Sequence, residues 1–236
     1  MLFDAHIHLL PGVGGDPTDI SESYLMLDRI NEAGVRGALS MTMLDPYRLP
    51  PIIYRMRCEE KIPLLRAYVK SQRYPIRLIF ATELLWRPGI HKDFDLTQFL
   101  VQGTHYLPLL FLAEPMTNDW MRDLSHYVSR LHFTPIVCHF DSQFMLGNGE
   151  RFLNSASLVF QISAASLRCK RFAKIVLEQM RAGRRFLIGS GAEIPEALLR
   201  KVCYSSDDWS LDILQKTVHD RLYLTNNDFR REISYR

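Results

Sequence analysis

The sequence is poor in cysteine, in long apolar runs and in charge of one sign, and each shortage excludes a class of protein. Its 236 residues hold four cysteines, scattered without a CxxC pair, so neither a disulfide scaffold nor a thiolate-rich zinc site is expected. No apolar run reaches the roughly eighteen residues of a membrane span, and Asp4, His6 and His8 interrupt the apolar stretch that a signal peptide would need. These shortages predict a cytoplasmic protein with no membrane span.

Nucleic-acid and nucleotide signatures are also missing. The formal net charge is +3, and the arginine-rich stretches RAGRR and RREISYR are too short for a nucleic-acid-binding arm. The glycines of PGVGGD do not form the GxxxxGK[ST] frame, and GSG at 189–191 lacks the GxSxG frame of a nucleophile elbow. The sequence therefore argues against a nucleic-acid partner, a P-loop nucleotide hydrolase and a serine hydrolase.

What the chain does contain is an alternation of short apolar runs with amphipathic segments from one end to the other. Expected strands cover residues 2–8, 35–41, 65–69, 77–81, 106–112, 136–139, 159–162 and 186–188. One helix is expected to begin after the cap Asp19 and to end at Gly34, and others cover 120–131 and 167–181. We expect one α/β domain over residues 1–236 with a mostly parallel sheet, either open or rolled into a barrel.

Unusual polar residues fall where these strands end. His8 closes the first strand, Glu83 follows LIFAT and His139 follows PIVC. In both parallel architectures ligands bind beyond the carboxyl ends of the strands, so these residues share one rim. His6 and His8 are two residues apart on a strand, so their side chains point to the same face.

Imidazoles and a carboxylate in this arrangement suit zinc, iron or manganese. His6, His8, Glu83 and His139 are therefore the candidate metal ligands, and His139 is also a candidate acid or base. The alternatives are hydrogen-bonded or exposed histidines, a glutamate in an exposed loop, and a His139 bonded to backbone. A carboxylate that follows an apolar run needs a cation, hydrogen-bond donors or solvent.

The order of motifs resembles one known family. The segments DAHIHLLPG, EAGVRGALSMT, ATELLW, HYLPLLF, FTPIVCHFD, VFQISAASL, RFLIGSGAE and LTNND resemble those of the bacterial capsule-type tyrosine phosphatases of the PHP (polymerase and histidinol phosphatase) family. The resemblance implies a distorted (β/α)7 TIM-like barrel and a cluster of up to three divalent metals acting on a phosphomonoester. It also implies a phosphotyrosine protein or a phosphorylated small molecule as partner. His6 and His8 match the opening metal-binding pair, Glu83 the bridging glutamate and His139 the histidine of HPER.

Other positions depart from the family pattern. Residues where the family carries ligands or its phosphate-binding arginine are here Gly14, Gly15, Met43, Leu110 or Phe111, Ser142 and the run Gly191-Ala192-Glu193. Only Glu83 is a matched carboxylate, and Glu193 and Asp141 are candidates to replace the others. Three divalent ions would bring six positive charges that one carboxylate cannot offset, so we expect about one ion at most, or none.

Three functions follow from this pattern. The first is a PHP-type metal-dependent phosphoesterase with an eroded metal centre and weak or lost activity. The second is a catalytically silent domain that serves as a binding or regulatory module. The third, an amidohydrolase-type enzyme with one metal, also begins with His-x-His on a first barrel strand, but the chain has no match to its carbamylated lysine.

Overall fold

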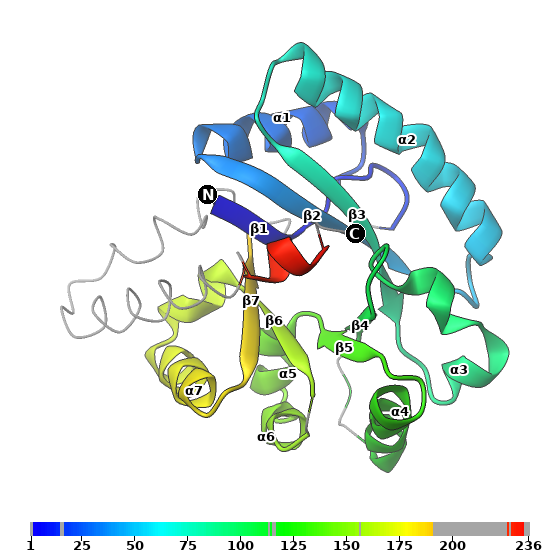
Figure 1. Ribbon diagram of the computed structural model, residues 1–236, viewed down its shortest axis with the longest axis vertical. Coiled ribbons are helices and arrows are strands. Elements are labelled where there is room, and N and C mark those ends of the chain that lie inside the picture. The colour runs from blue at the N-terminus through cyan, green and yellow to red at the C-terminus, as the bar shows by residue number, and fades with distance from the viewer. Residues whose placement is uncertain are drawn as a thin grey trace.

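The computed structural model describes residues 2–14, 17–112, 114, 117–155, 157–190, 226 and 228–233. Its centre is one parallel sheet of seven strands in sequence order, rolled into a nearly closed barrel with helices around it (Figure 1). The strands are β1 (Leu2–Ile7), β2 (Val35–Leu44), β3 (Arg77–Leu85), β4 (Tyr106–Leu110), β5 (Thr134–Val137), β6 (Val159–Ser163) and β7 (Arg185–Gly189). The expected TIM-like fold class is confirmed.

The helices occupy the connections between strands. They are α1 (Ile20–Glu32), α2 (Pro51–Ser71), α3 (Ile90–Asp93), α4 (Asn118–Ser129), α5 (Phe140–Met145), α6 (Gly149–Leu153) and α7 (Lys170–Arg181), with 3-10 turns η1 (Leu96–Phe99) and η2 (Ala164–Arg168). Asp19 caps α1 as expected, because its carboxylate accepts from the backbone N–H groups of Ser21 and Glu22. None of the helices among the described residues is both long and apolar enough to span a membrane.

One expected strand was wrong, and one expected helix begins three residues later than predicted. The segment 65–69 is part of α2, because Leu65 and Val69 lie four residues apart on the helix face that also buries Tyr54 and Cys58. A short apolar run was mistaken there for a strand. The segment 167–181 is divided, because the backbone of Cys169 is extended and ends η2 before α7 begins.

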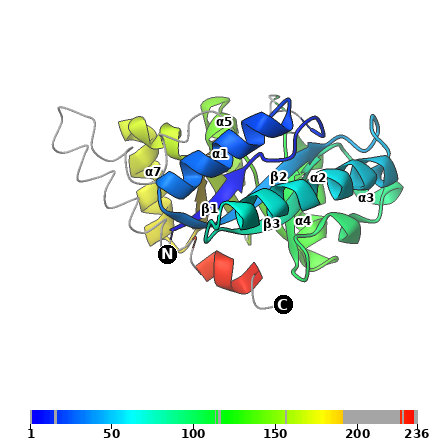
Figure 2. The ribbon, with the colours of Figure 1, turned by 90° about the horizontal axis from the view of Figure 1, so that it is seen from above.

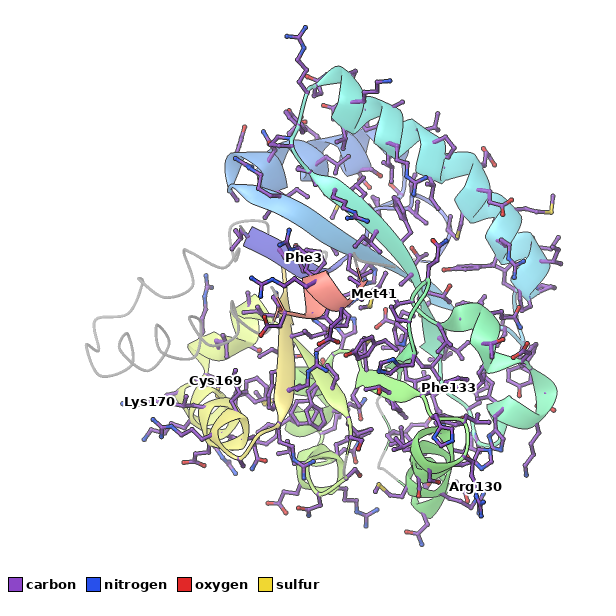
Figure 3. All side chains as sticks on the ribbon, in the orientation of Figure 1. Phe3, Met41, Arg130, Phe133, Cys169 and Lys170 are labelled. Carbon is purple, nitrogen blue, oxygen red and sulfur yellow. The ribbon has the colours of Figure 1, made fainter. Side chains whose placement is uncertain are left out.

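A second apolar cluster fills the inside of the barrel. It contains Phe3, Ala5, Leu39, Met41, Val101, Tyr106, Ile136, Cys138, Val159, Leu187, Phe229 and Ile233. Phe3 and Met41 lie near the middle of the ring of strands, beside the helical residues 228–233 (Figure 3). This last segment (red) lies outside the layer of strands (Figure 2), and Phe229 and Ile233 extend the interior cluster. The amino end of the barrel is thereby covered.

Side chains join the first and last strands. Asn226 donates to the carbonyl oxygens of Phe3 and Ile188 and accepts from the N–H of Ile188. Nearer the carboxyl end, Asp4 accepts from the N–H and the hydroxyl of Ser190. These bonds link β1 to β7, which are the two end strands of the sheet order.

Candidate metal centre

The two N-terminal histidines reach the barrel mouth because β1 contains a bulge. Asp4 pairs with Ala38 and Ile7 with Ser40, so β1 carries one more residue than β2 over this stretch. Ala5 belongs to the interior cluster, whereas Ile7 belongs to the main apolar cluster, which also contains the buried side chains of α1 and α2. The extra residue therefore lets His6 follow Ala5 toward the inside, and His8 falls on the same face as His6.

The four candidate ligands come from three strands and meet at the carboxyl end of the barrel. His6 lies on β1 and His8 follows it, Glu83 lies on β3, and His139 follows β5. Each side chain offers one ligand atom, and these atoms all lie within 4.8 Å of one another. The structure thus brings together all four residues singled out in the sequence.

The ligand atoms of the cluster lie 3.1 to 3.7 Å from their nearest neighbours. The Nε2 atoms of His6 and His8 are 3.1 Å apart, and each lies 3.7 Å from Oε2 of Glu83. Nε2 of His139 lies 3.5 Å from Oε1 of the same carboxylate. Three imidazoles therefore surround one carboxylate at distances longer than a hydrogen bond.

The carboxylate of Glu83 is fully buried. The side chains of His6 and Glu83 are fully buried, whereas 17% of the His8 side chain and 36% of the His139 side chain are exposed. Among the described residues, no hydrogen-bond partner satisfies either carboxylate oxygen of Glu83. A buried charge in this state needs a nearby cation.

The electrostatics of the cluster favour ligand-ready forms. Burial alone would raise the pKa of Glu83, but the neighbouring imidazoles, with His6 foremost, lower it to about 2. Burial, and then the charge of His6, lower the pKa of His8 to about 4. At neutral pH Glu83 is therefore ionised and His8 is neutral, which are the forms that bind metals.

His139 is held by its backbone. Its φ of 51° lies in the left-handed region, which is unusual for a residue other than glycine and common at functional sites. The His139 N–H donates to Oε1 of Gln161 at 2.8 Å, and Nε2 of Gln161 donates to the carbonyl of Ile162. The buried amide of Gln161 thus fixes the start of α5.

One departure from the family pattern has a steric basis. A Cβ atom at Gly14 would lie 2.2 Å from the carbonyl oxygen of Met43, because the loop after β1 runs against the end of β2. Two of the positions where the family carries ligands therefore touch each other through backbone. An acidic side chain cannot be added at Gly14 unless this loop moves.

The remaining departures that fall on described residues add no ligand to the cluster. Phe111 packs against Trp86, Trp120 and Phe152 in an aromatic group, and Ser142 is exposed. Asp141 accepts from the N–H of Ser163 and is not in the group of four. Gly15 and the run Gly191-Ala192-Glu193 lie outside the described residues.

Sequence reasoning missed two supporting residues, Asp4 and Gln161. Asp4 was noted only as a charge near the N-terminus, although its side chain is fully buried beside His6. Gln161 is a polar residue inside the apolar strand VFQIS, and that interruption was the available signal.

No protein-family model matches the sequence, and no curated protein matches it significantly. Among solved structures, the chain is similar to one from the work on YwqE from Bacillus subtilis and CpsB from Streptococcus pneumoniae, described as unique metal-dependent tyrosine phosphatases. The TM-score is 0.68 at 15% identity, over 94% of each chain. The chain therefore shares the fold of these phosphatases, and the resemblance seen in the sequence is confirmed at that level.

A second similar structure is more distant. N-isopropylammelide isopropylaminohydrolase from Burkholderia multivorans has a TM-score of 0.43 at 13% identity, over 99% of this chain and 74% of its own.

Proposed function

We propose that His6, His8, Glu83 and His139 hold a single divalent metal ion and that the protein is a PHP-type phosphoesterase with an eroded metal centre and weak activity. One observation carries this proposal: within the described residues the buried carboxylate of Glu83 has no hydrogen bond and lies among three imidazoles. Three nitrogen donors and one oxygen donor match the preferences of zinc, iron and manganese.

The proposed number of ions follows from charge. The four side chains contribute one negative charge when the histidines are neutral, which partly offsets a single divalent ion. Two or three ions would leave several positive charges uncompensated in a partly buried site. The contact between Gly14 and Met43 supports the same number, because it removes space that another ligand would occupy.

When bound, such an ion supplies a Lewis acid that lowers the pKa of water. The residues divide the remaining tasks. Fully buried His6 and Glu83 anchor the site, whereas His139, with a partly exposed side chain, either completes the ligand set or exchanges a proton with a substrate. Gln161 keeps the His139 backbone in the conformation that directs this side chain.

The substrate class proposed is a phosphomonoester, on a phosphotyrosine protein or on a phosphorylated small molecule, because the fold is that of enzymes described as tyrosine phosphatases. We extend the proposal to residues 1–236 as one domain, since this likeness covers 94% of the chain. The second candidate is a catalytically silent binding or regulatory module, favoured by the exposed Ser142 where the family carries an arginine.

Elemental analysis of protein purified without a histidine tag tests the metal proposal. We expect about one ion per chain after incubation with manganese, iron or zinc, and loss of that ion in His8→Ala, which removes one of four ligands. Asp141→Asn is the matched control, because this carboxylate lies outside the group of four.

Two results would contradict the proposal in different ways. No bound metal in the native protein would support the silent module. Two or three well-occupied ions would show that the charge count is wrong.

A further inference from the structure

Helix α2 exposes apolar side chains on the side that faces away from the barrel. Its inner side buries Tyr54, Cys58, Leu65 and Val69. The other side exposes Ile52 (60%), Ile53 (40%), Met56 (59%) and Leu64 (44%). We call these four residues the α2 stripe. A helix that only covers a sheet has a polar outer face, so the stripe indicates a surface for binding another protein.

Two charged residues on this side of α2 are flanked by two apolar residues in a symmetric arrangement. Ile53, Arg57, Glu60 and Leu64 are spaced at i, i+4, i+7 and i+11, so they lie along one side of the helix. The four positions are symmetric about the point midway between Cys58 and Glu59. An apolar residue stands at each end, and opposite charges stand in between.

We propose that the α2 stripe binds a second copy of this chain, with the two α2 helices antiparallel across a two-fold axis. A two-fold axis through the midpoint brings Ile53 against the partner's Leu64 and Arg57 against the partner's Glu60. Both pairs occur twice, as a two-fold interface requires. In this arrangement apolar side chains meet apolar ones, and each positive charge meets a negative one.

Electrostatics favour this partner and this direction. Arg57 has no ion pair among the described residues, and Glu60 is 66% exposed with one neighbour, Lys61 at 2.7 Å. In the antiparallel pair each Arg57 meets the Glu60 of the second copy. Parallel helices in register would instead place Arg57 against Arg57 and Glu60 against Glu60. An unrelated partner would need a matching charge pattern of its own.

The expected affinity is modest. From Ile52 to Leu64 the stripe is roughly 18 Å long at the rise of an α-helix. A single helix pair of this length buries less than a standard stable interface, so we expect dimers at about 10 to 100 µM and monomers at about 1 µM. Helix α2, which carries the stripe, lies on the outside of the strand ring (Figure 1).

Sedimentation velocity of the full chain over about 1 to 100 µM tests the proposal. We expect the native protein to dimerise with rising concentration and Met56→Glu to stay monomeric. Met145→Glu is the matched control, because Met145 is 61% exposed on α5, outside the stripe, and this variant should dimerise like the native protein. Circular dichroism melting confirms that each variant is folded.

A charge exchange tests the register. Arg57→Glu and Glu60→Arg should each weaken dimerisation about tenfold, and the double variant should restore it, because the pairs across the axis are then reversed but still opposite. A native protein that is monomeric throughout, equal effects of Met56→Glu and Met145→Glu, or a double variant weaker than either single one would each overturn the proposal.

Discussion

Two fully buried carboxylates, Asp4 and Glu83, both lie beside His6 but differ in how their charge is satisfied. Asp4 accepts hydrogen bonds from the backbone N–H of His6 at 3.1 Å, and from the N–H and hydroxyl of Ser190 at 3.0 and 2.5 Å. Glu83 accepts no hydrogen bond from the part of the chain that the structure describes, and it lies 3.5 to 3.7 Å from three imidazole nitrogens. Burial is therefore equal, but only one of the two is satisfied by the protein.

The difference separates a structural role from a proposed ligand role. Asp4 links β1 to the end of β7, and its bonds are complete without any ligand. Burial raises the pKa of Asp4 in spite of these bonds, whereas the imidazoles lower that of Glu83 to about 2. An unsatisfied carboxylate that is nevertheless held in its charged form points to a cation.

The largest effect is expected on metal affinity. Glu83→Gln should weaken binding of manganese or zinc by about 100-fold or more, because the amide removes the negative charge among the ligands. Asp4→Asn should leave the affinity within about threefold, since its side-chain oxygen can still accept from both N–H groups. Isothermal titration of the two variants measures this contrast. Equal losses would mean that Asp4 also belongs to the metal centre.

The next effect is on stability. Asp4→Ala should lower the free energy of unfolding by about 3 to 5 kcal/mol, because it leaves the N–H groups of His6 and Ser190 buried without acceptors. Ser190→Ala removes one hydroxyl bond and should cost about 1 kcal/mol. Urea denaturation of the metal-free proteins checks both values. A loss below about 1 kcal/mol in Asp4→Ala would show that the link between β1 and β7 is dispensable.

A third effect concerns the pH dependence of the metal-free protein. The pKa of His8 is about 4 in the folded state and 6.5 in a model peptide, so unfolding takes up a proton between these values. Stability is therefore complete above pH 6.5 and falls by about 3 kcal/mol as the pH drops to 4. The lowered pKa of Glu83 extends this loss from pH 4.5 toward 2. His8→Gln should remove most of the slope between pH 6.5 and 4, as measured by urea denaturation, and an unchanged slope would assign it to other groups such as His91, whose pKa burial also lowers.

Much of the site was predictable because it depends on local periodicity. The two-residue spacing of His6 and His8 places them on one face, and the parallel alternation brings Glu83 and His139 to the same rim. The bulge at Ala5 and His6 was not predictable, because it depends on the register between β1 and β2. Nothing local in the sequence marks the contacts of Asp4, since its partner lies 186 residues away.

Closure of the barrel likewise depends on contacts that local sequence does not show. Asn226 bonds to both β1 and β7 from a segment near the C-terminus, and only the closed barrel brings these parts together. In α2, by contrast, the four-residue spacing of Leu65 and Val69 fits both the two-residue period of a strand and the 3.6-residue period of a helix. The length of the helix and its buried partners decide between them.

The smallest effect is expected in catalysis. Turnover of p-nitrophenyl phosphate or phosphotyrosine peptides should stay near background, even with added manganese, iron or zinc. Phosphoryl transfer needs groups aimed at the developing charge on the phosphate oxygens, and each is worth about 10²-fold or more. Here Ser142 is exposed where the family carries its arginine, and Met43 touches Gly14 where other ligands are expected.

Any residual metal-dependent rate should disappear in Glu83→Gln and persist in Asp4→Asn, which carries the contrast between the two carboxylates into the activity itself. A direct assay of untagged protein measures it, with His6→Ala as a further variant. Rapid turnover in the native protein that is lost in both His6→Ala and Glu83→Gln would establish an active phosphoesterase. The four side chains would then suffice for catalysis, and the missing arginine and further ligands would not be essential to the chemistry.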